Sequence, residues 1–415
     1  MSRTIPLSLL VLSTLHWGCN PDPSPQATAT VSIELGNDTG TTEPKDVELG
    51  DTVDDVDDDG EVRKEDGGQT SDPGDTHSPK EVDWSGVEAL IESKVALSNA
   101  TIMMGNADGT FFSYSRGDST EESPYTIASA SKLLMAITTL RLVETGDLNL
   151  DTTAAGLLPF WTTDTEDPRS QVTLEQLLSF TSGFAGGSGL SPEDEALSCV
   201  EDKEASTTTC SQEIYDQAFE FSPPGSTFFY GPGHMYIAAA MALEVRTEFT
   251  WNKIFRNEIG DPLNLAPLAG FLLPSPLNGR PSGGVVMSAK DYATILTALL
   301  AGELLSEESV TQLSADRTPS ASVILSNPPS AASEGEWHYA LGCWRECPGN
   351  YNEENCDAPG VISSPGAFGF YPWWDQENGI WGLVALQYPA PTGASVTVPI
   401  GTEIRNMALE LISTP

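Results

Sequence analysis

The sequence predicts an α/β fold: an antiparallel sheet flanked by N- and C-terminal helices, with an all-helical domain inserted between the strands. Two observations predict it. Strand-like segments occur near both ends of the region 84–415, whereas residues 129–300 are mostly helical and loop-like. Helix-like segments also open and close this region, around 87–93 and 402–412. With about 330 residues, the region is long enough for a substantial core.

The first strands are predicted at 101–104 and 110–114, which flank an Asn-Ala-Asp-Gly turn. Later strand patterns lie at 337–344, 366–374 and 380–387. Between them, the clearest helix follows Lys132, with apolar residues at 133, 134, 137, 140 and 143 and a stop at Gly146.

The first nineteen residues are typical of a secretory signal. Arg3 precedes an apolar stretch over 5–15, which ends at Gly18 and Cys19 and is too short to span a membrane. The Gly-Cys ending resembles a bacterial lipoprotein signal, so we expect Cys19 to become a lipidated N-terminus. The protein would then be exported to the cell envelope and held on a bacterial membrane by its lipid alone. The alternative is an ordinary signal peptide, which would give a secreted or periplasmic protein.

Residues 20–83 are predicted to form an acidic disordered linker. They contain 19 Asp or Glu against four Lys or Arg, with many Pro, Gly, Ser and Thr. Such a segment buries too little apolar surface to offset its ordering entropy. The acidic run at 54–60 does not have the spacing of a calcium-binding EF-hand loop. The net charge of the whole chain, -41, argues against nucleic-acid partners.

The cysteines fit an exported protein, because disulfides form in oxidising compartments. We expect Cys199 to pair with Cys210 and Cys347 with Cys356, and Cys343 to be a free buried thiol. With four His in the chain and no two C-x-x-C pairs, neither a zinc site nor any other metal or cofactor is predicted.

Ser129 and Lys132 are the candidate nucleophile and base. Residues three apart lie on one face of a helix, so the lysine amine can reach the serine hydroxyl. A Ser hydroxyl needs a neighbouring base, and burial lowers the pKa of a Lys enough for it to serve. The alternative interpretation is an N-capping Ser followed by a solvated Lys.

Six segments, in this order, resemble the serine beta-lactamase and penicillin-binding-protein superfamily, in particular its class C beta-lactamase and esterase-like branch. The first holds Ser-x-x-Lys, and later ones resemble the family's T-x-x-x-L-L-x-x-T-S-G segment and the surroundings of its second and third motifs. The six segments are 125–132, 142–151, 172–184, 224–230, 283–292 and 364–369. The resemblance implies the beta-lactamase/transpeptidase-like fold, which agrees with the pattern of strands and helices.

The resemblance also implies catalytic roles. Ser129 would attack a carbonyl carbon and form an acyl-enzyme, and Lys132 would help activate it. Tyr230 would move the proton between nucleophile and leaving group, and it could be a phenolate only if cations lower its pKa. The alternative interpretation of Tyr230 is an aromatic core residue. The backbone N–H groups of Ser129 and Ala367 would form the oxyanion hole.

Two motifs depart from the family pattern. Pro232 replaces the Asn of the second motif, and Ser364-Pro365-Gly366 lacks the Lys or His that commonly opens the third. Ser364 and Gly366 would line the substrate site without a cation for a substrate carboxylate. His234 could compensate, or it is a structural histidine. The departures favour esters or peptide-like amides as substrates.

Three alternatives are kept beside this hypothesis. One is a true beta-lactamase or D-Ala-D-Ala carboxypeptidase. Another is a non-catalytic surface lipoprotein that keeps the fold for binding. The third, a Ser-His-Asp hydrolase, lacks its G-x-S-x-G elbow here, although residues 187–189 superficially resemble part of one. We expect a monomer.

Overall fold

The computed structural model describes residues 82–183, 195–217, 222–246, 248–318, 323–324, 337–347, 360–389 and 391–413. The predicted signal and all but the last two residues of the predicted linker lie outside these ranges, as do Cys19 and the Gly-Ser-Gly run at 187–189. No helix in the described ranges is long and apolar enough to cross a membrane.

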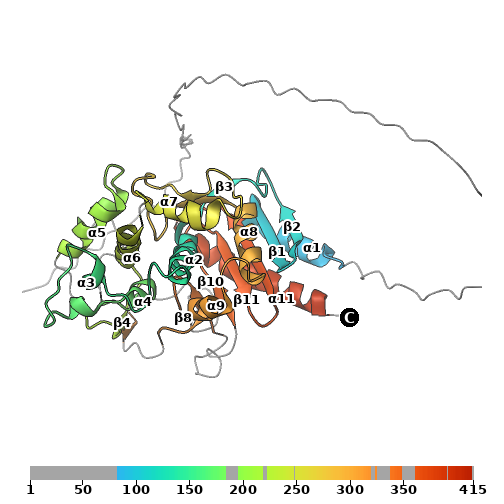
Figure 1. Ribbon diagram of the computed structural model, residues 1–415. Coiled ribbons are helices and arrows are strands. Elements are labelled where there is room, and N and C mark those ends of the chain that lie inside the picture. Colours follow the sequence, from blue (N-terminus) through green and yellow to red (C-terminus); the bar gives the residue numbers. More distant parts are fainter. Residues whose placement is uncertain are drawn as a thin grey trace, which may run out of the picture. The chain divides into compact units, whose positions relative to one another are not determined.

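The described part of the chain contains a seven-stranded antiparallel sheet that joins strands from its two ends (Figure 1). The N-terminal hairpin packs against the C-terminal strand, for example with Ile102 opposite Val384. The spatial order of the strands is β2 (Gly109–Ser115), β1 (Ala100–Asn106), β12 (Ile380–Leu386), β11 (Tyr371–Asp375), β10 (Val361–Ser363), β9 (Trp344–Glu346) and β8 (Trp337–Tyr339). The predicted antiparallel sheet is confirmed.

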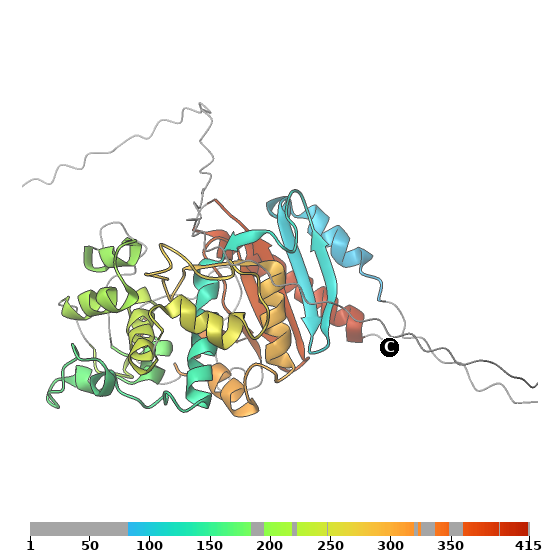
Figure 2. The ribbon, with the colours of Figure 1, turned by 45° about the horizontal axis from the view of Figure 1, so that its top comes forward.

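Helices cover both faces of this sheet, which explains why every residue of β12 is buried. The first and last helices pack against each other on one face, and α8 packs on the other (Figure 2). At Gly401 a Cβ would lie 2.7 Å from the ring of Tyr371, so α11 approaches β11 too closely for a side chain. The helices concerned are α1 (Ser85–Ser93), α8 (Ala289–Leu300) and α11 (Gly393–Ser413).

The middle of the chain forms a largely helical region beside the sheet, and α2 lies between the two (Figure 1). Most of α2 is buried, including polar residues such as Lys132 and Thr138, because it is covered by the elements around it. The remaining helices are η1 (Val95–Leu97), η2 (Ala128–Ala130), α2 (Ser131–Glu144), α3 (Ala154–Leu157), η3 (Pro168–Gln171), α4 (Leu174–Leu178), η4 (Glu195–Glu201), α5 (Thr207–Asp216), α6 (Pro232–Val245), α7 (Trp251–Phe255), η5 (Arg256–Gly260) and α9 (Glu307–Ser314).

Between β2 and β8 the chain also forms short strands that the sequence prediction did not include. These are β3 (Pro124–Thr126), β5 (Gly270–Phe271) and β6 (Val285–Ser288) in one small sheet, and β4 (Thr227–Phe228) paired with β7 (Val323–Ile324). All have two to four residues, too few for a periodic pattern to show.

Three predicted boundaries were wrong. The strand expected at 337–344 is two strands, because Gly342 adopts a positive φ of 67° in the turn between them. The strand expected at 366–374 begins only at Tyr371, after a turn in which Gly369 has a φ of 94°. The C-terminal helix begins at Gly393 rather than near 402, although it contains Pro399. Packing against the sheet outweighs these weak helix formers.

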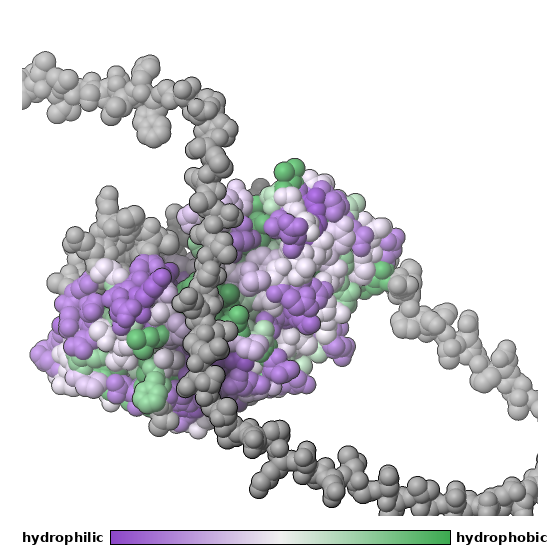
Figure 3. Space-filling model, turned by 90° about the horizontal axis from the view of Figure 1, so that it is seen from above, coloured by the Kyte–Doolittle hydropathy of each residue, from purple (hydrophilic) through white to green (hydrophobic). Residues whose placement is uncertain are grey.

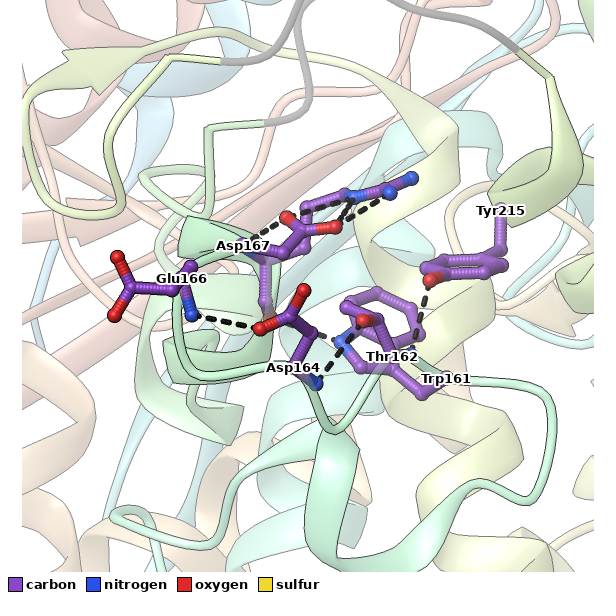
Figure 4. Close-up of polar contacts among 7 residues, drawn as sticks. Trp161, Thr162, Asp164, Glu166, Asp167 and Tyr215 are labelled. Carbon is purple, nitrogen blue, oxygen red and sulfur yellow. Dashed lines mark hydrogen bonds and ion pairs between the residues drawn. The ribbon is translucent and has the colours of Figure 1, made fainter.

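The helical region is fixed by local polar and aromatic contacts, of which Figure 4 shows one group. Trp161 and Tyr215 have ring centroids 4.5 Å apart, and the Thr162 backbone N–H donates to the Tyr215 hydroxyl at 2.9 Å. Asp167 binds the guanidinium of Arg169, which in turn lies 5.1 Å from the Tyr215 ring. These contacts attach the chain after α3 to α5.

The predicted disulfide between Cys199 and Cys210 is present, which confirms that pairing. Cys343 is a free buried thiol, also as predicted. Cys347 is disulfide-bonded as well, but Cys356 lies outside the described residues. The Cys347–Cys356 pairing therefore stays a prediction.

Candidate active site

Ser129 and Lys132 lie where the helical region meets the sheet, at the N-terminal end of α2. Ser129 belongs to the single turn η2, and Lys132 to the first turn of α2. Lys132 Nζ donates to Ser129 Oγ at 3.0 Å. Ala128 has a φ of 47°, which is uncommon for a residue other than glycine and marks a strained turn just before Ser129. The spacing of three residues thus brings the two groups together.

Lys132 is buried, with only 5% of the residue exposed, and its Nζ also donates to the Ser282 carbonyl at 2.6 Å. Burial, and secondarily the charge of Arg280, lowers the pKa of Lys132 from 10.5 to about 7. A solvated lysine is therefore the wrong description. Near neutral pH a large share of the amine is uncharged, and an uncharged amine can accept the proton of Ser129.

Tyr230 completes a group of three side chains. Its hydroxyl is hydrogen-bonded to the side chain of Ser129, and Lys132 Nζ lies 4.7 Å from the centre of its ring. The ring stacks on Trp344 at 5.5 Å and meets the edge of Phe180 at 5.0 Å. Burial raises the pKa of Tyr230 well above 10, so the group is a phenol rather than a phenolate at neutral pH.

The segment after β10 packs directly against the turn that carries Ser129. Ser364 Oγ donates to the Ser129 carbonyl at 3.0 Å. At Gly366 a Cβ would lie 2.1 Å from the carbonyl oxygen of Ile127, so no side chain fits there. Ala367 follows Gly366 and is partly exposed. Ser364 is therefore beside Ser129, and Gly366 lies against the residue two positions before it. The substrate-binding and oxyanion-hole roles that the resemblance implies for Ser364, Gly366 and Ala367 stay predictions.

His234 lies in α6 and faces the core. It is 1% exposed, its Nδ1 is 2.8 Å from Ser182 Oγ, and its ring lies 5.0 Å from that of Phe180. Burial lowers the pKa of His234 to about 3, so the imidazole is neutral at pH 7. These contacts favour the structural interpretation of His234 over a cation that binds a substrate carboxylate.

Pro232 has a structural reason to replace the family's Asn. It occupies the first turn of α6, where a missing N–H costs nothing and the fixed φ favours a helix. Ser131 is also structural: it is fully buried, and its Oγ accepts the Val285 N–H at 3.1 Å, which ties β6 to α2. Ser129 is the serine that is partly exposed.

Sequence reasoning missed two participants. The Ser282 carbonyl accepts a hydrogen bond from Lys132, and the charge of Arg280 lowers the pKa of Lys132. The sequence at 283–292 resembles the family but does not indicate either contact. No local spacing could reveal them, because the Lys132–Ser282 contact joins residues 150 apart in the chain. In the ranges that the structure describes, no cluster of three or more His, Cys, Asp or Glu is arranged to hold a metal ion.

The chain belongs to the Beta-lactamase family, whose sequence model matches residues 87–397. It is thus a serine hydrolase with a beta-lactamase/transpeptidase-like fold, which confirms the resemblance seen in the sequence. Penicillin-binding protein 4 of Amycolatopsis lactamdurans is 32% identical over 149 residues, covering 35% of this chain and 36% of that protein. The chain therefore matches only about a third of that relative's length.

Solved structures give the same fold. A candidate beta-lactamase from Bacteroides dorei DSM 17855 is 26% identical with a TM-score of 0.64, and the match covers 78% of this chain and 99% of that one. EstCE1, a hydrolase with promiscuous acyltransferase activity, has a TM-score of 0.61 at 16% identity, covering 78% and 96%. At that identity the second likeness concerns the fold alone.

Proposed function

We propose that this chain is an exported, lipid-anchored serine hydrolase that works through an acyl-enzyme on Ser129, with neutral esters as its preferred substrates. The observation that carries the proposal is the 3.0 Å contact between Ser129 Oγ and a buried Lys132 whose pKa is about 7. The same chemistry extends to peptide-like amides, but esters are the easier substrates because an alkoxide leaves more readily than an amide nitrogen.

The mechanism follows from the protonation states. Uncharged Lys132 accepts the Ser129 proton while Oγ attacks the carbonyl carbon, and the tetrahedral oxyanion binds the backbone N–H groups of Ser129 and Ala367. The Tyr230 phenol is protonated and lies against both groups, so it donates to the departing oxygen and recovers a proton from Lys132. Water then attacks the acyl-enzyme, and the same groups act in reverse.

The preference for neutral substrates rests on the charges around Ser129. Ser364 stands where a cation commonly opens the third motif, and His234 is neutral. The guanidinium of Arg280 is paired with the Glu201 carboxylate. A substrate carboxylate would lack a free cationic partner, and the acidic chain disfavours anions at long range.

The test is a side-by-side measurement of kcat/KM for a short-chain p-nitrophenyl ester and for nitrocefin. The ester is expected to be the better substrate, with slow or absent beta-lactam turnover. A nitrocefin value about tenfold higher than that of the ester would contradict the preference. It would mean that another cation binds the substrate carboxylate, for example an Arg280 that is no longer paired with Glu201.

A further inference from the structure

The turn that holds Lys132 is bound to the disulfide-linked segment beside it through one buried side chain, Asn278. Asn278 is 0% exposed, and its Nδ2 donates to two backbone carbonyls at 2.8 Å each, those of Cys199 and Asp202. Its Oδ1 accepts the Tyr236 hydroxyl at 3.1 Å. Its backbone N–H donates to Ser275 Oγ at 3.2 Å. An amide that is fully used in this way fixes three segments to one another.

Those segments all lead to the active site. Tyr236 is in α6, the helix that begins just after Tyr230. The disulfide between Cys199 and Cys210 joins η4 to α5. The turn of residues 272–284 contains Asn278 itself and ends with Ser282, whose carbonyl holds Lys132.

Neighbouring contacts join the same two segments. Ser275 Oγ donates to the Lys203 carbonyl at 2.8 Å, and the Arg280 guanidinium binds the Glu201 carboxylate. The turn is also too tight for side chains at Gly279 and Gly284, where a Cβ would lie 2.4 and 2.3 Å from the carbonyl oxygens of Phe271 and Leu273. It is thus a rigid element attached to η4, and it carries both Ser282 and Arg280.

We propose that Asn278 is a positioning residue for catalysis: it holds the 272–284 turn against the disulfide-linked segment so that Ser282 orients the Lys132 amine toward Ser129. This inference rests on the proposed function, because it assigns Asn278 a role in the reaction of the same site. Asn278 itself does not touch the reacting atoms. It acts through Ser282, which fixes the amine, and through Arg280, which stays near it.

The proposal has a signature that a purely structural role lacks. The titratable groups that face Lys132 are Tyr230, from the chain before α6, and Arg280, from the turn. If the turn loosens, water reaches the amine and Arg280 moves away. Both changes raise the pKa of Lys132 toward 10.5. The acidic limb, the part of the pH profile in which the acylation rate rises with pH, must then move to higher pH.

The experiment measures the acylation rate of the full chain against pH with a fluorophosphonate probe, and kcat and KM with a p-nitrophenyl ester. Asn278→Ala should lower kcat about tenfold or more with little change in KM, because a small misplacement of a catalytic group is costly. Its acidic limb should move to higher pH. Ser275→Ala removes a more exposed contact between the same two segments, the 2.8 Å hydrogen bond to the Lys203 carbonyl. It should shift the acidic limb in the same direction by less, and it tests the proposal if Asn278→Ala does not fold.

Thr101→Val is the matched control. Thr101 is 0% exposed and makes two side-chain hydrogen bonds, to Ser115 and Ser119. It lies in β1 and is not part of the 272–284 turn or of the disulfide-linked segment. It should lower Tm while leaving the limb and kcat unchanged. The proposal is overturned if Asn278→Ala and Ser275→Ala lose stability as the control does, yet keep the wild-type limb and kcat. Absence of any labelling at Ser129 in the wild type would instead reject the proposed function.

Discussion

Lys132 is the residue on which the chemistry depends, because its charge decides whether Ser129 can be activated. With a pKa lowered to about 7, the amine is mostly charged at pH 6 and mostly uncharged at pH 8. A general base must be unprotonated, so the active fraction grows with pH across this range.

The first residue-scale prediction concerns this titration. The acylation rate should rise as pH increases through about 7 and then level off. Lys132→Met should lower the rate by about 10²–10⁴-fold, the usual range for a lost general base, without unfolding the domain. Stopped-flow acylation with an ester substrate measures both. A rate that is flat between pH 6 and 8 would contradict the assignment of Lys132 as the base.

The same variant has a stability signature. Between pH 7 and 10.5 the unfolded chain holds a proton on Lys132 that the folded chain gives up, so the stability of the wild type rises with pH there. Below about 7 the full cost of burying the amine applies. Lys132→Met should therefore be more stable than the wild type, and the difference should grow as pH falls from 10.5 to 7.

The three side chains that meet at the candidate site were predictable from motifs. The spacing of three places Lys132 within reach of Ser129, and the family resemblance of the surrounding segments singled out this pair and Tyr230. The roles of Ser282 and Asn278 were not predictable. Ser282 acts through its backbone carbonyl and Asn278 through a buried side-chain amide, and both reach their partners only in the folded chain. The environment of His234 was equally invisible, since burial rather than sequence sets its charge.

At the scale of elements, the C-terminal helix α11 is held on the sheet by a buried ion pair. Arg405 binds Glu346 of β9 through both terminal nitrogens at 3.1 Å, and Tyr371 of β11 donates to the same carboxylate at 2.6 Å. The side chains of Arg405 and Glu346 are 9% and 7% exposed. Removal of one partner would leave the other charge buried and unpaired.

Arg405→Ala should therefore destabilise the domain by about 3–5 kcal/mol. Urea unfolding followed by tryptophan fluorescence measures the change. Lys94→Ala is a suitable control, because its ion pair with Glu403 involves the same helix but is much more exposed, at 28% and 50%, and its loss should cost little. A similar loss of stability in the two variants would contradict the view that burial makes the Arg405 pair matter.

The long elements were predictable and the short ones were not. The β1–β2 hairpin and α2 have enough residues to show their periods, and both appear close to the predicted ranges. Strand β10 has three residues and pairs with segments on either side, so its pattern is set by the neighbours. Helix α11 was predicted too short because Gly393, Pro399 and Gly401 are poor helix formers that packing overrides.

At the scale of the whole molecule, membrane anchoring depends on which apolar groups the protein exposes. The face seen in Figure 3 mixes hydrophilic residues with small hydrophobic patches. Most large apolar side chains of the described residues are in the core, and exposed ones such as Phe249 and Val95 are far apart in the sequence. The proposal assigns membrane attachment to the lipid on Cys19, which lies outside the described residues.

Cys19→Ala should therefore release the protein from the membrane fraction of its native host, because the lipid would be the sole anchor. Fractionation followed by immunoblotting measures the distribution, and Cys343→Ala, which removes a buried free thiol, is the control that should stay with the membrane. Persistence of the Cys19 variant in the membrane fraction would refute lipidation as the only anchor.

The central claim is that Ser129 is the residue that becomes acylated. Its most direct test is peptide mapping by mass spectrometry after treatment with a fluorophosphonate or labelled-penicillin probe. One adduct per chain is expected, on Ser129, absent in Ser129→Ala and retained in Ser131→Ala, since the Ser131 hydroxyl is buried against β6. An adduct on Ser131 or Ser188 would contradict the mechanism, and no adduct at all would favour a binding protein that has kept the fold.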